Sequence, residues 1–160
     1  MEIVSREVIQ WQPAVTVERV KANIRLTDNS FDDIIQEYIS SAIATSEQVT
    51  GVVINASTFT IVGYYEGAYR LPIAPIIDIE VECDGVAVDY ELNGGVLILP
   101  SDYIGKRVTI TAHAGYSEVP ADIRMAIILK ASALFLNPVD GADTYVKASD
   151  NLLKNYRVWR

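Results

Sequence analysis

The spacing of apolar residues changes inside one continuous stretch, Val108 to Phe135, and this change constrains the fold more than any other feature. The first part alternates apolar and polar residues, which is typical of a half-buried β-strand. Its apolar set is Val108, Ile110, Ala112 and Ala114. After Gly115-Tyr116 and a short loop, Pro120 opens a segment in which six residues, all but one of them apolar, share one helical face. That face comprises Ile123, Ala126, Ile127, Lys130, Ala131 and Leu134. The stretch predicts a strand and then a helix over 120–136 that packs against a sheet, and nothing in it indicates catalysis.

Two further helices are predicted within residues 16–51. Thr16 is a candidate N-cap for a short helix ending near Leu26, and Ser30 is a candidate N-cap for a longer helix ending at Gly51. The longer helix carries apolar residues at offsets of three and four, so one of its faces should be buried. This stripe consists of Phe31, Ile34, Ile35, Tyr38, Ile39, Ala42 and Ile43.

Residues 52–114 are predicted to be β-rich because their apolar residues recur with a period of two. The candidate strands are 52–56, 58–65, 76–83, 86–90, 96–99 and 106–114. Pro72 and Pro75 exclude a central strand between the second and third of these. Asp84-Gly85 and Asn93-Gly94-Gly95 are typical of tight hairpin turns, which join antiparallel strands. Helices, an antiparallel β-meander and C-terminal helices together predict an α+β fold with a mainly helical core and a β-hairpin arm.

The composition is that of a folded protein. Of the 160 residues, 50% are hydrophobic and 21% are charged, which excludes intrinsic disorder, and the length suits one domain. No apolar run approaches the roughly 20 residues of a membrane helix, and the N-terminus lacks a signal-peptide pattern. We therefore expect a soluble, intracellular protein without a membrane partner. The single cysteine, Cys83, lies on the apolar side of an alternating strand and is expected to be buried.

Charge is unevenly distributed along the chain. The net charge of −8 argues against sequence-independent binding of nucleic acid, which depends on neutralising phosphates with Lys and Arg. The C-terminal segment is nevertheless basic, with Lys147, Lys154, Arg157 and Arg160 against Asp150. Two interpretations remain open: cations that complement the dipole of a helix C-terminus, or a basic tail that binds an acidic partner.

No pattern indicates a catalytic, cofactor or metal site. The lone histidine, His113, lies on the strand side opposite Val108 and Ile110, and it lacks an obvious nucleophile and an orienting acid. One His and one Cys are too few for a zinc site, and Gly94-Gly95 precedes a strand rather than a helix that could bind phosphate. The carboxylates also have structural explanations, either at a helix start or in a loop without EF-hand spacing. They are Asp32, Asp33, Glu37, Asp140 and Asp143.

Aromatic residues gather in two places. Tyr64, Tyr65 and Tyr69 lie in a β-hairpin region with few charges, where they could either pack in the core or form a contact between subunits. An apolar stripe near the C-terminus belongs to a segment too short to be stable alone, so it must dock on its own domain or on a partner. The stripe is Leu152, Leu153, Tyr156 and Trp159.

Taken in order, these motifs resemble those of the small head-tail connector (adaptor or head-completion) proteins of long-tailed phages and prophages. The resemblance covers nearly the whole chain except Asn55 to Glu66, where only a general apolar strand character matches. The matching features are the helix Thr16–Leu26, the helix Phe31–Gly51, the Leu71-Pro72-x-x-Pro75 turn, the Ala-Gly-Tyr-x-x-Val-Pro-x-x-Ile run from Ala114 to Ile123, and the terminal Tyr-Arg-x-Trp-Arg.

The resemblance implies a single connector domain spanning residues 1–160, with a docking tail at 145–160. It also implies a non-enzymatic virion protein, made in the bacterial cytoplasm, that forms a ring, commonly of twelve copies, between the portal at the capsid vertex and the next neck or tail-completion protein. DNA would pass through the lumen without specific binding. The tail residues expected to bind the portal are Leu152, Leu153, Tyr156, Arg157, Trp159 and Arg160, and the expected subunit contact is Tyr64, Tyr65 and Tyr69. Residues 150–160 should then be removable without unfolding the domain. The alternative is a small soluble binding module that uses its β-sheet face.

Overall fold

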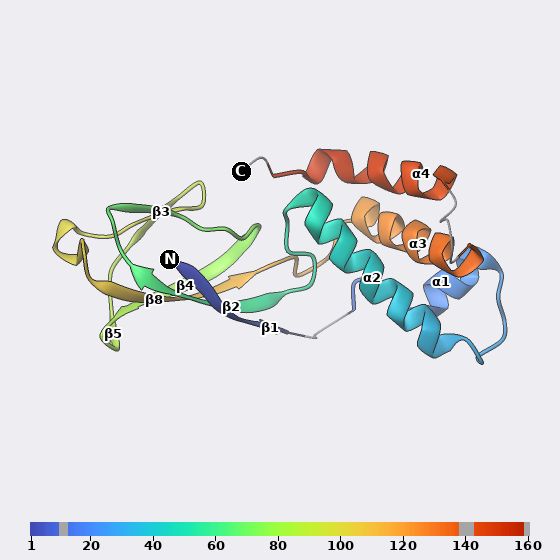
Figure 1. Cartoon of the computed structure of the whole chain (residues 1–160), viewed down its shortest axis with the longest axis horizontal. Helices are drawn as coiled ribbons and strands as arrows, with labels where there is room; N and C mark the ends of the chain where they lie inside the picture. The colour runs from blue at the N-terminus through green and yellow to red at the C-terminus, as the bar shows by residue number, and fades with distance from the viewer. Residues whose placement is uncertain (10–12, 138–142, 159–160) are drawn as a thin grey trace. The chain divides into compact units, whose positions relative to one another are not determined.

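The computed structural model describes residues 1–9, 13–137 and 143–158 (Figure 1). In chain order the elements are β1 (Glu2–Val8), α1 (Val17–Ile24), α2 (Asp32–Thr50), β2 (Ser57–Tyr64), β3 (Ala68–Arg70), β4 (Ile76–Cys83), β5 (Val86–Ala87), β6 (Glu91–Asn93), β7 (Val96–Ile98), the 3-10 helix η1 (Ser101–Tyr103), β8 (Arg107–Ala114), α3 (Ala121–Leu136), α4 (Asp143–Leu153) and the 3-10 helix η2 (Lys154–Tyr156). The predicted α+β class with antiparallel strands is confirmed.

The elements form two compact units. The β unit consists of Met1–Trp11 and Asn55–Ser117, and the helical unit consists of Gln12–Ile54 and Glu118–Arg160. The chain therefore starts in the β unit, forms α1 and α2, returns to complete the sheets, and ends with α3 and α4. The single connector domain over 1–160 stays a prediction.

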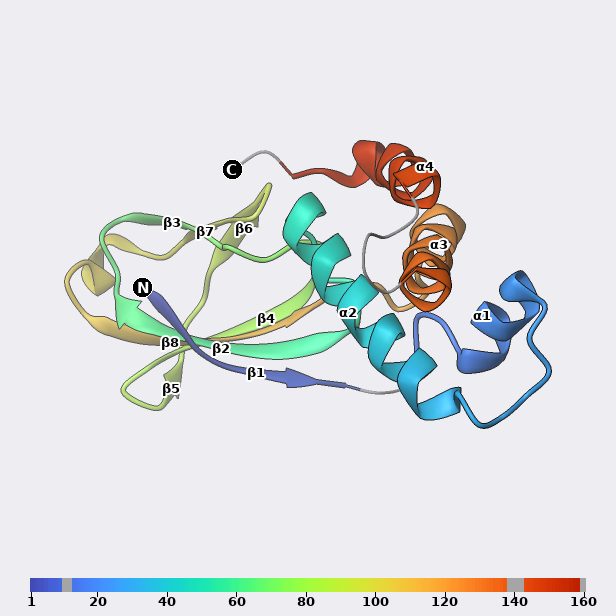
Figure 2. The same ribbon diagram turned by 45° about the vertical axis from the view of Figure 1, so that its right-hand side comes forward.

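The β unit contains a five-stranded sheet in the order β1-β2-β8-β4-β5, in which every pair is antiparallel (Figure 2). β8, the last strand in sequence, lies between β2 and β4. It pairs with β2 from Ser57 opposite Ala114 to Tyr64 opposite Arg107. Alternate residues of the three central strands are buried on one face, which we call the inner face; the opposite face is the outer face. The buried set is Phe59, Ile61, Ile79, Val81, Cys83, Val108, Ile110 and Ala112. Burial of Cys83 confirms the sequence-based expectation.

A second sheet of three short strands, in the order β3-β7-β6, completes the β unit (Figure 2). The Tyr65 hydroxyl joins the end of β2 to the end of β7, because it accepts a hydrogen bond from Leu99 N at 2.8 Å and donates one to Leu99 O at 3.4 Å. Leu97 in β7 is fully buried. Both predicted hairpin turns are present: Cys83 pairs with Val86 across Asp84-Gly85, and Asn93 pairs with Val96 across Gly94-Gly95. Each turn needs positive φ angles, which Asp84, Gly85, Gly94 and Gly95 adopt.

The two edges of the five-stranded sheet differ. β1 pairs with β2 on one side only, with one register shift, and all seven of its residues are exposed. The opposite edge is covered beyond the short β5. There, Val88 N donates to Val81 O at 2.9 Å, and the Tyr90 hydroxyl donates to Ile79 O at 2.8 Å. Two outward carbonyls of β4, those of Ile79 and Val81, are therefore already used within the chain.

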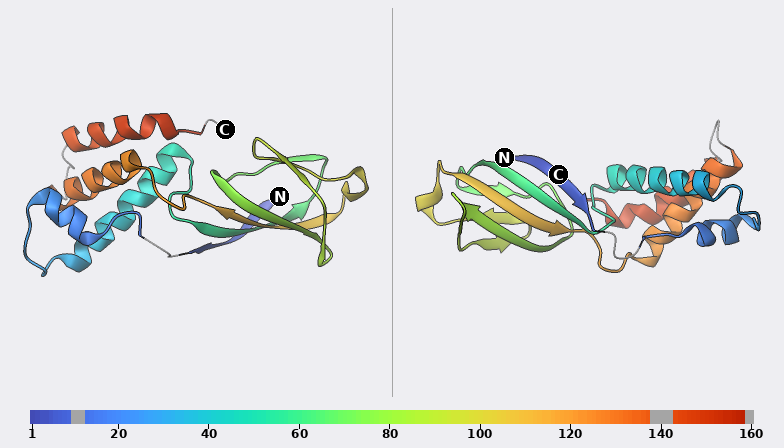
Figure 3. Two further views of the ribbon diagram at one scale, coloured as in Figure 1. Left: turned by 180° about the vertical axis from the view of Figure 1, so that it is seen from behind. Right: turned by 90° about the horizontal axis from the view of Figure 1, so that it is seen from below.

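In the helical unit, α3 is the central helix and packs against α1, α2 and α4 (Figure 3). The stripe predicted on the longer helix is confirmed at Ile35, Ile39 and Ala42, which are buried, whereas Phe31 and Ile34 at its start are exposed. Gly51 ends α2 with a left-handed φ of 73°, as the sequence predicts.

Three sequence-based expectations need correction. The helix predicted to pack on a sheet, α3, packs on the other helices, because buried residues surround most of its circumference. Residues 52–56 do not form a strand: their backbone is held near the end of α2, where Glu47 Oε1 accepts a hydrogen bond from Ile54 N at 2.8 Å. Finally, the β-rich segment forms two sheets with their own core rather than a hairpin arm, and β1, which the sequence analysis did not predict, extends the larger sheet.

Candidate partner-binding surfaces

The C-terminal helix α4 is fixed to α3 by polar and apolar contacts. Ser149 Oγ donates a hydrogen bond to Ala126 O at 3.0 Å, and Lys130 Nζ lies 3.3 Å from Asp150 Oδ1. The Lys130 side chain is 8% exposed and that of Asp150 is 40% exposed, so the ion pair lies at the border of the core. Leu153 at the end of α4 is fully buried. The helix is therefore part of the helical unit rather than a loose appendage.

The segment after α4 continues along the same unit. It forms η2, and then Val158 N donates a hydrogen bond to Thr50 O, at the end of α2, at 2.8 Å. The last carbonyls of a helix have no hydrogen-bond partner within the helix, and the N–H of Val158 is the partner for one of these carbonyls in α2. This bond positions the segment as far as Val158 beside the end of α2.

The structure separates the residues predicted to bind the portal into three groups. Leu152 and Tyr156 are half-buried and Arg157 is exposed, so these three can reach a partner. Leu153 is 0% exposed and cannot. Its assignment as a docking residue is corrected: an apolar stripe at helical spacing fits either a core or an interface, and here Leu153 belongs to the core. Trp159 and Arg160 lie outside the described residues. Removing residues 150–160 would thus delete part of the core, contrary to the sequence-based expectation.

The three tyrosines predicted to form a subunit contact also differ. Tyr64 is 66% exposed on the outer face of the sheet. Tyr65 is 0% exposed and its hydroxyl is satisfied by Leu99, so it is a core residue and not a contact. Tyr69 in β3 is half-buried, and burial raises the pKa of its phenol above the ordinary value. The surface-accessible part of the predicted contact is therefore Tyr64 and Tyr69.

The outer face of the five-stranded sheet is polar. Its middle rows come from β2 and β8, where Thr60 lies opposite Thr111 and Thr58 lies opposite His113. These side chains are half-buried, and Thr58 Oγ1 lies 3.0 Å from His113 Nδ1. A neighbouring row comes from β4, where outward residues alternate with buried ones. These outward residues, Asp78, Glu80 and Glu82, are exposed carboxylates that were not among the residues predicted to be functional. Their alternation with Ile79, Val81 and Cys83 was the signal that could have revealed them.

His113 has neighbours that fit a structural position. It faces the outer side of the sheet, as its parity in the strand predicts, and Asp78 lies opposite it on β4. Asp78 Oδ1 accepts a hydrogen bond from Ile79 N at 2.9 Å. Among residues 1–9, 13–137 and 143–158, no group of three His, Cys, Asp or Glu side chains is placed to hold a metal ion. In the same residues, no helix is long and apolar enough to cross a membrane.

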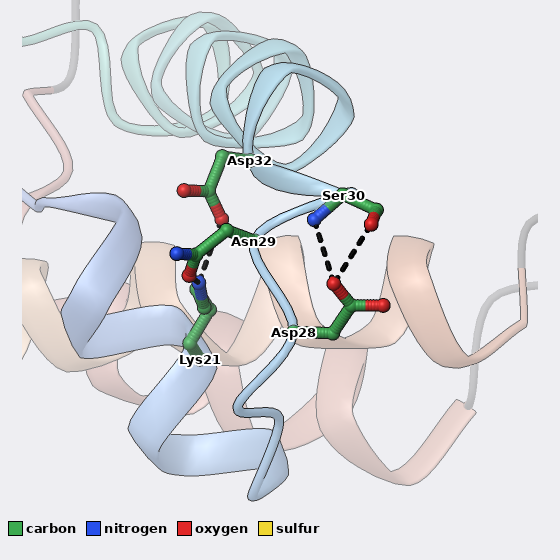
Figure 4. Close-up of polar contacts among 5 residues, drawn as sticks. All are labelled: Lys21, Asp28, Asn29, Ser30 and Asp32. Carbon is green, nitrogen blue, oxygen red and sulfur yellow. Dashed lines mark hydrogen bonds and ion pairs between the residues drawn. The ribbon is translucent and has the colours of Figure 1, made fainter.

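A polar cluster fixes the turn between α1 and α2 (Figure 4). Lys21 Nζ donates hydrogen bonds to Asn29 Oδ1 and to Asp32 Oδ1, the latter at 2.7 Å. Asp28 Oδ1 accepts hydrogen bonds from the backbone N–H and the hydroxyl of Ser30, and these bonds lower the pKa of Asp28 below its ordinary value. Ser30 is therefore occupied by Asp28 rather than capping α2, which begins at Asp32. The cluster has structural partners throughout and supports no catalytic assignment.

Comparisons with known proteins bear on the fold. Neither a protein-family model nor a curated protein sequence matches the chain. Solved structures do match over nearly the full length of both chains. One is a chain of the virion of a native gene transfer agent particle, with a TM-score of 0.76 and 20% identity over 98% of this chain and 97% of that chain. A second is from the neck of an empty gene transfer agent particle computed with C6 symmetry, with a TM-score of 0.72 and 21% identity over 98% and 97%. A third is from the neck of a native particle computed with C12 symmetry, with a TM-score of 0.70 and 22% identity over 100% and 97%. The protein thus has the fold of virion and neck chains of a phage-like particle, as the resemblance to connectors predicts.

Proposed function

We propose that this protein is a non-enzymatic structural component of the neck of a phage-like particle. In this proposal its copies form a ring between the portal at the capsid vertex and the next neck or tail-completion protein. The observation that carries the proposal is the fold, which matches neck chains over nearly the whole length of this chain and of those chains. The C12 symmetry of one matching neck structure supports a ring of twelve copies. The proposal places the protein in the virion, after assembly in the bacterial cytoplasm.

The charge of the chain suits a conduit for DNA. No Lys or Arg occurs between Leu71 and Gly105, whereas that segment contains Asp78, Glu80, Glu82, Asp84, Asp89, Glu91 and Asp102. Proteins bind DNA phosphates mainly through Lys and Arg, which neutralise the phosphates and release the counterions of the DNA into solution. A ring with a net charge of −8 per subunit would let DNA pass through without retaining it.

The C-terminal segment is the proposed portal-binding element. Leu152, Tyr156 and Arg157 reach the surface in the structure, and the proposal adds Trp159 and Arg160 at the end of the chain. Arginine would pair with portal carboxylates, while aromatic side chains would supply buried contact area. Tyr64 and Tyr69 remain candidates for the contact between subunits.

The proposal is tested by co-expressing the chain with the portal protein of the same particle. We expect a complex that co-purifies and shows a ring on the portal by electron microscopy. Purification of the two proteins separately, with only single subunits of this chain at every concentration, would contradict the proposed function.

A deletion shorter than residues 150–160 tests whether the C-terminal segment binds the portal. Deleting residues 157–160 keeps α4 and the buried Leu153, so the variant should fold and melt close to the wild-type temperature while losing portal binding. Arg157→Ala should weaken binding in the same direction. Arg19→Ala, which removes an exposed arginine from α1, is the matched control and should leave binding unchanged. Full portal binding by the deletion variant would show that another surface makes the contact.

A further inference from the structure

The outer face of the five-stranded sheet carries a row of like charges along β4. Asp78, Glu80 and Glu82 point outward because the residues between them are buried. Successive carboxylates on one face of a strand are about 7 Å apart, so they repel one another. No ion pair within the described residues involves any of the three.

The rest of this face is polar and partly exposed. Beside the carboxylates lies β8, whose Thr109 and Thr111 are half-buried opposite Glu82 and Glu80. In the described strands, the one cation on this face is Arg107, the first residue of β8, which lies opposite Tyr64. Asp78 lies opposite His113, near the other end of β8. The outer face is therefore a polar surface with an acidic border on β4.

The exposed side of α4 has the complementary charge. Lys147 and Asn151 are exposed four residues apart in α4, which places them on the same side of the helix, away from Leu153. Lys154, also exposed, is the first residue of η2 directly after α4. Asp150, three residues after Lys147, borders this side with a side chain that is 40% exposed, and its charge is offset by Lys130 of the same chain. Seven residues of helical chain, the last of them in η2, place the two lysines about 10 Å apart. Four residues of strand place Asp78 and Glu82 about 13 Å apart, so the two charge rows have similar lengths, and flexible lysine side chains can cover the difference.

We propose that the outer face of the five-stranded sheet binds the exposed side of α4 of a second copy of this chain. The inference rests on the proposed function, because it assigns the contact between neighbours in the ring. The two surfaces differ, so each copy offers α4 to one neighbour and its sheet to the other, and such a head-to-tail contact forms a ring when the rotation between neighbours closes. Tyr64 lies on the same outer face and contributes apolar area to the contact. Complementary charges set the register and the rate of association.

Charge-reversal variants of the full chain test this contact. The helix variant is Lys147→Glu with Lys154→Glu, and the sheet variant is Glu80→Lys with Glu82→Lys. All four side chains are exposed, so both variants should keep the wild-type melting temperature. Alone, each should raise the dissociation constant for self-association about tenfold or more in sedimentation velocity. Wild-type association should also weaken from about 0.05 M to about 0.5 M NaCl, because salt screens exposed charges.

Two controls carry the same change of charge at other exposed positions. Arg19→Glu with Arg25→Glu matches the helix variant, and Asp33→Lys with Glu37→Lys matches the sheet variant. Both controls should associate as wild type does. A loss of association in the controls equal to that of the test variants would mean that net charge, and not this contact, controls assembly.

Mixing the two variants distinguishes a contact between copies from one within a chain. In the mixture, the acidic helix of one variant meets the basic sheet of the other, and the two unchanged surfaces also match. Assembly should therefore recover in the mixture, as rings of alternating copies. Recovery only when all four substitutions are on one chain would show a contact within the chain and overturn the proposal. Unchanged self-association in both variants would also overturn it.

The same samples separate this inference from the proposed function. If rings still form on the portal with both variants, the neck function holds and the assigned contact is wrong. If the helix variant self-associates normally but no longer binds the portal, α4 contacts the portal and the inference fails. If the wild-type chain neither self-associates nor binds the portal, the proposed function itself fails and the inference falls with it.

Discussion

Replacing Leu153 by alanine tests whether α4 is part of the core or a free docking element. Leu153 is fully buried at the end of α4. The substitution removes about three carbon groups from the core, at roughly 0.8 kcal/mol each, and leaves a cavity that adds to the loss. We expect the free energy of unfolding to fall by about 3 kcal/mol. For a chain of this size, each kcal/mol lowers the melting temperature by about 2–4 °C, so the expected decrease is about 6–12 °C.

The measurement is thermal unfolding followed by the helical signal in far-ultraviolet circular dichroism, because Leu153 lies in the helical unit. Leu152→Ala is the matched control: its side chain is half-buried, so the same chemical change should cost less than half as much. Under the proposed function, Leu152→Ala should weaken portal binding at nearly normal stability. Equal melting temperatures for Leu153→Ala and the wild type would refute the placement of α4 in the core.

Three further changes test the helical unit. Ile35→Asp places a carboxylate at a 0% exposed position and should prevent folding, at a cost above about 4 kcal/mol; a soluble variant with a cooperative melt would show that another face of α2 is buried. Asp150→Ala leaves the nearly buried Lys130 ammonium without its partner and should cost about 2 kcal/mol in urea unfolding, part of which Lys130→Met should restore; no loss would mean that the pair contributes nothing. The pKa of Asp28 is lowered by the N–H and hydroxyl of Ser30, so its stabilisation is present above about pH 4 and disappears as pH falls through the lowered folded-state pKa. Asp28→Asn should therefore differ from wild type in urea unfolding at pH 7 and converge with it at low pH, and a difference that grows on acidification would contradict the assignment.

The helices were predictable because their apolar residues recur with a clear period. Ile35 and Ile39 are buried as their spacing requires, and Gly51 ends α2. What the spacing did not show was the partner of each helix. α3 has buried residues on most of its sides, including Lys130, which marks a helix surrounded by other helices rather than one lying on a sheet.

The sheets were less predictable for two reasons. β1 has no buried residue, so its sequence EIVSREV lacks the alternation that reveals a half-buried strand. Residues 52–54 are apolar and buried, yet they form no strand. The backbone N–H of Ile54 donates its hydrogen bond to the side chain of Glu47 in α2 and not to a neighbouring strand. The position of β8 between β2 and β4 depends on pairing between distant segments, which local patterns do not encode.

In the candidate surfaces, too, local sequence patterns did not show which single residues are buried and which are exposed. An apolar stripe at Leu152 and Leu153, or a run of tyrosines at Tyr64 and Tyr65, is equally consistent with a core and with a contact. In both pairs the structure exposes the first residue at least in part and buries the second. Whether each residue is in the core or on the surface depends on how the elements pack. The sequence could therefore identify the two segments, but not which of their residues are buried and which are exposed.

Under the proposed function, subunits accumulate before they assemble, and the covered edge of β4 then matters. A long open strand edge can pair with any other extended chain, which leads to fibres and aggregates. Val88 and Tyr90 donate hydrogen bonds to the outward carbonyls of Val81 and Ile79, so these carbonyls are not available to another extended chain. If the protein assembles as proposed, its unassembled subunits would not polymerise strand upon strand at the carbonyls of Ile79 and Val81.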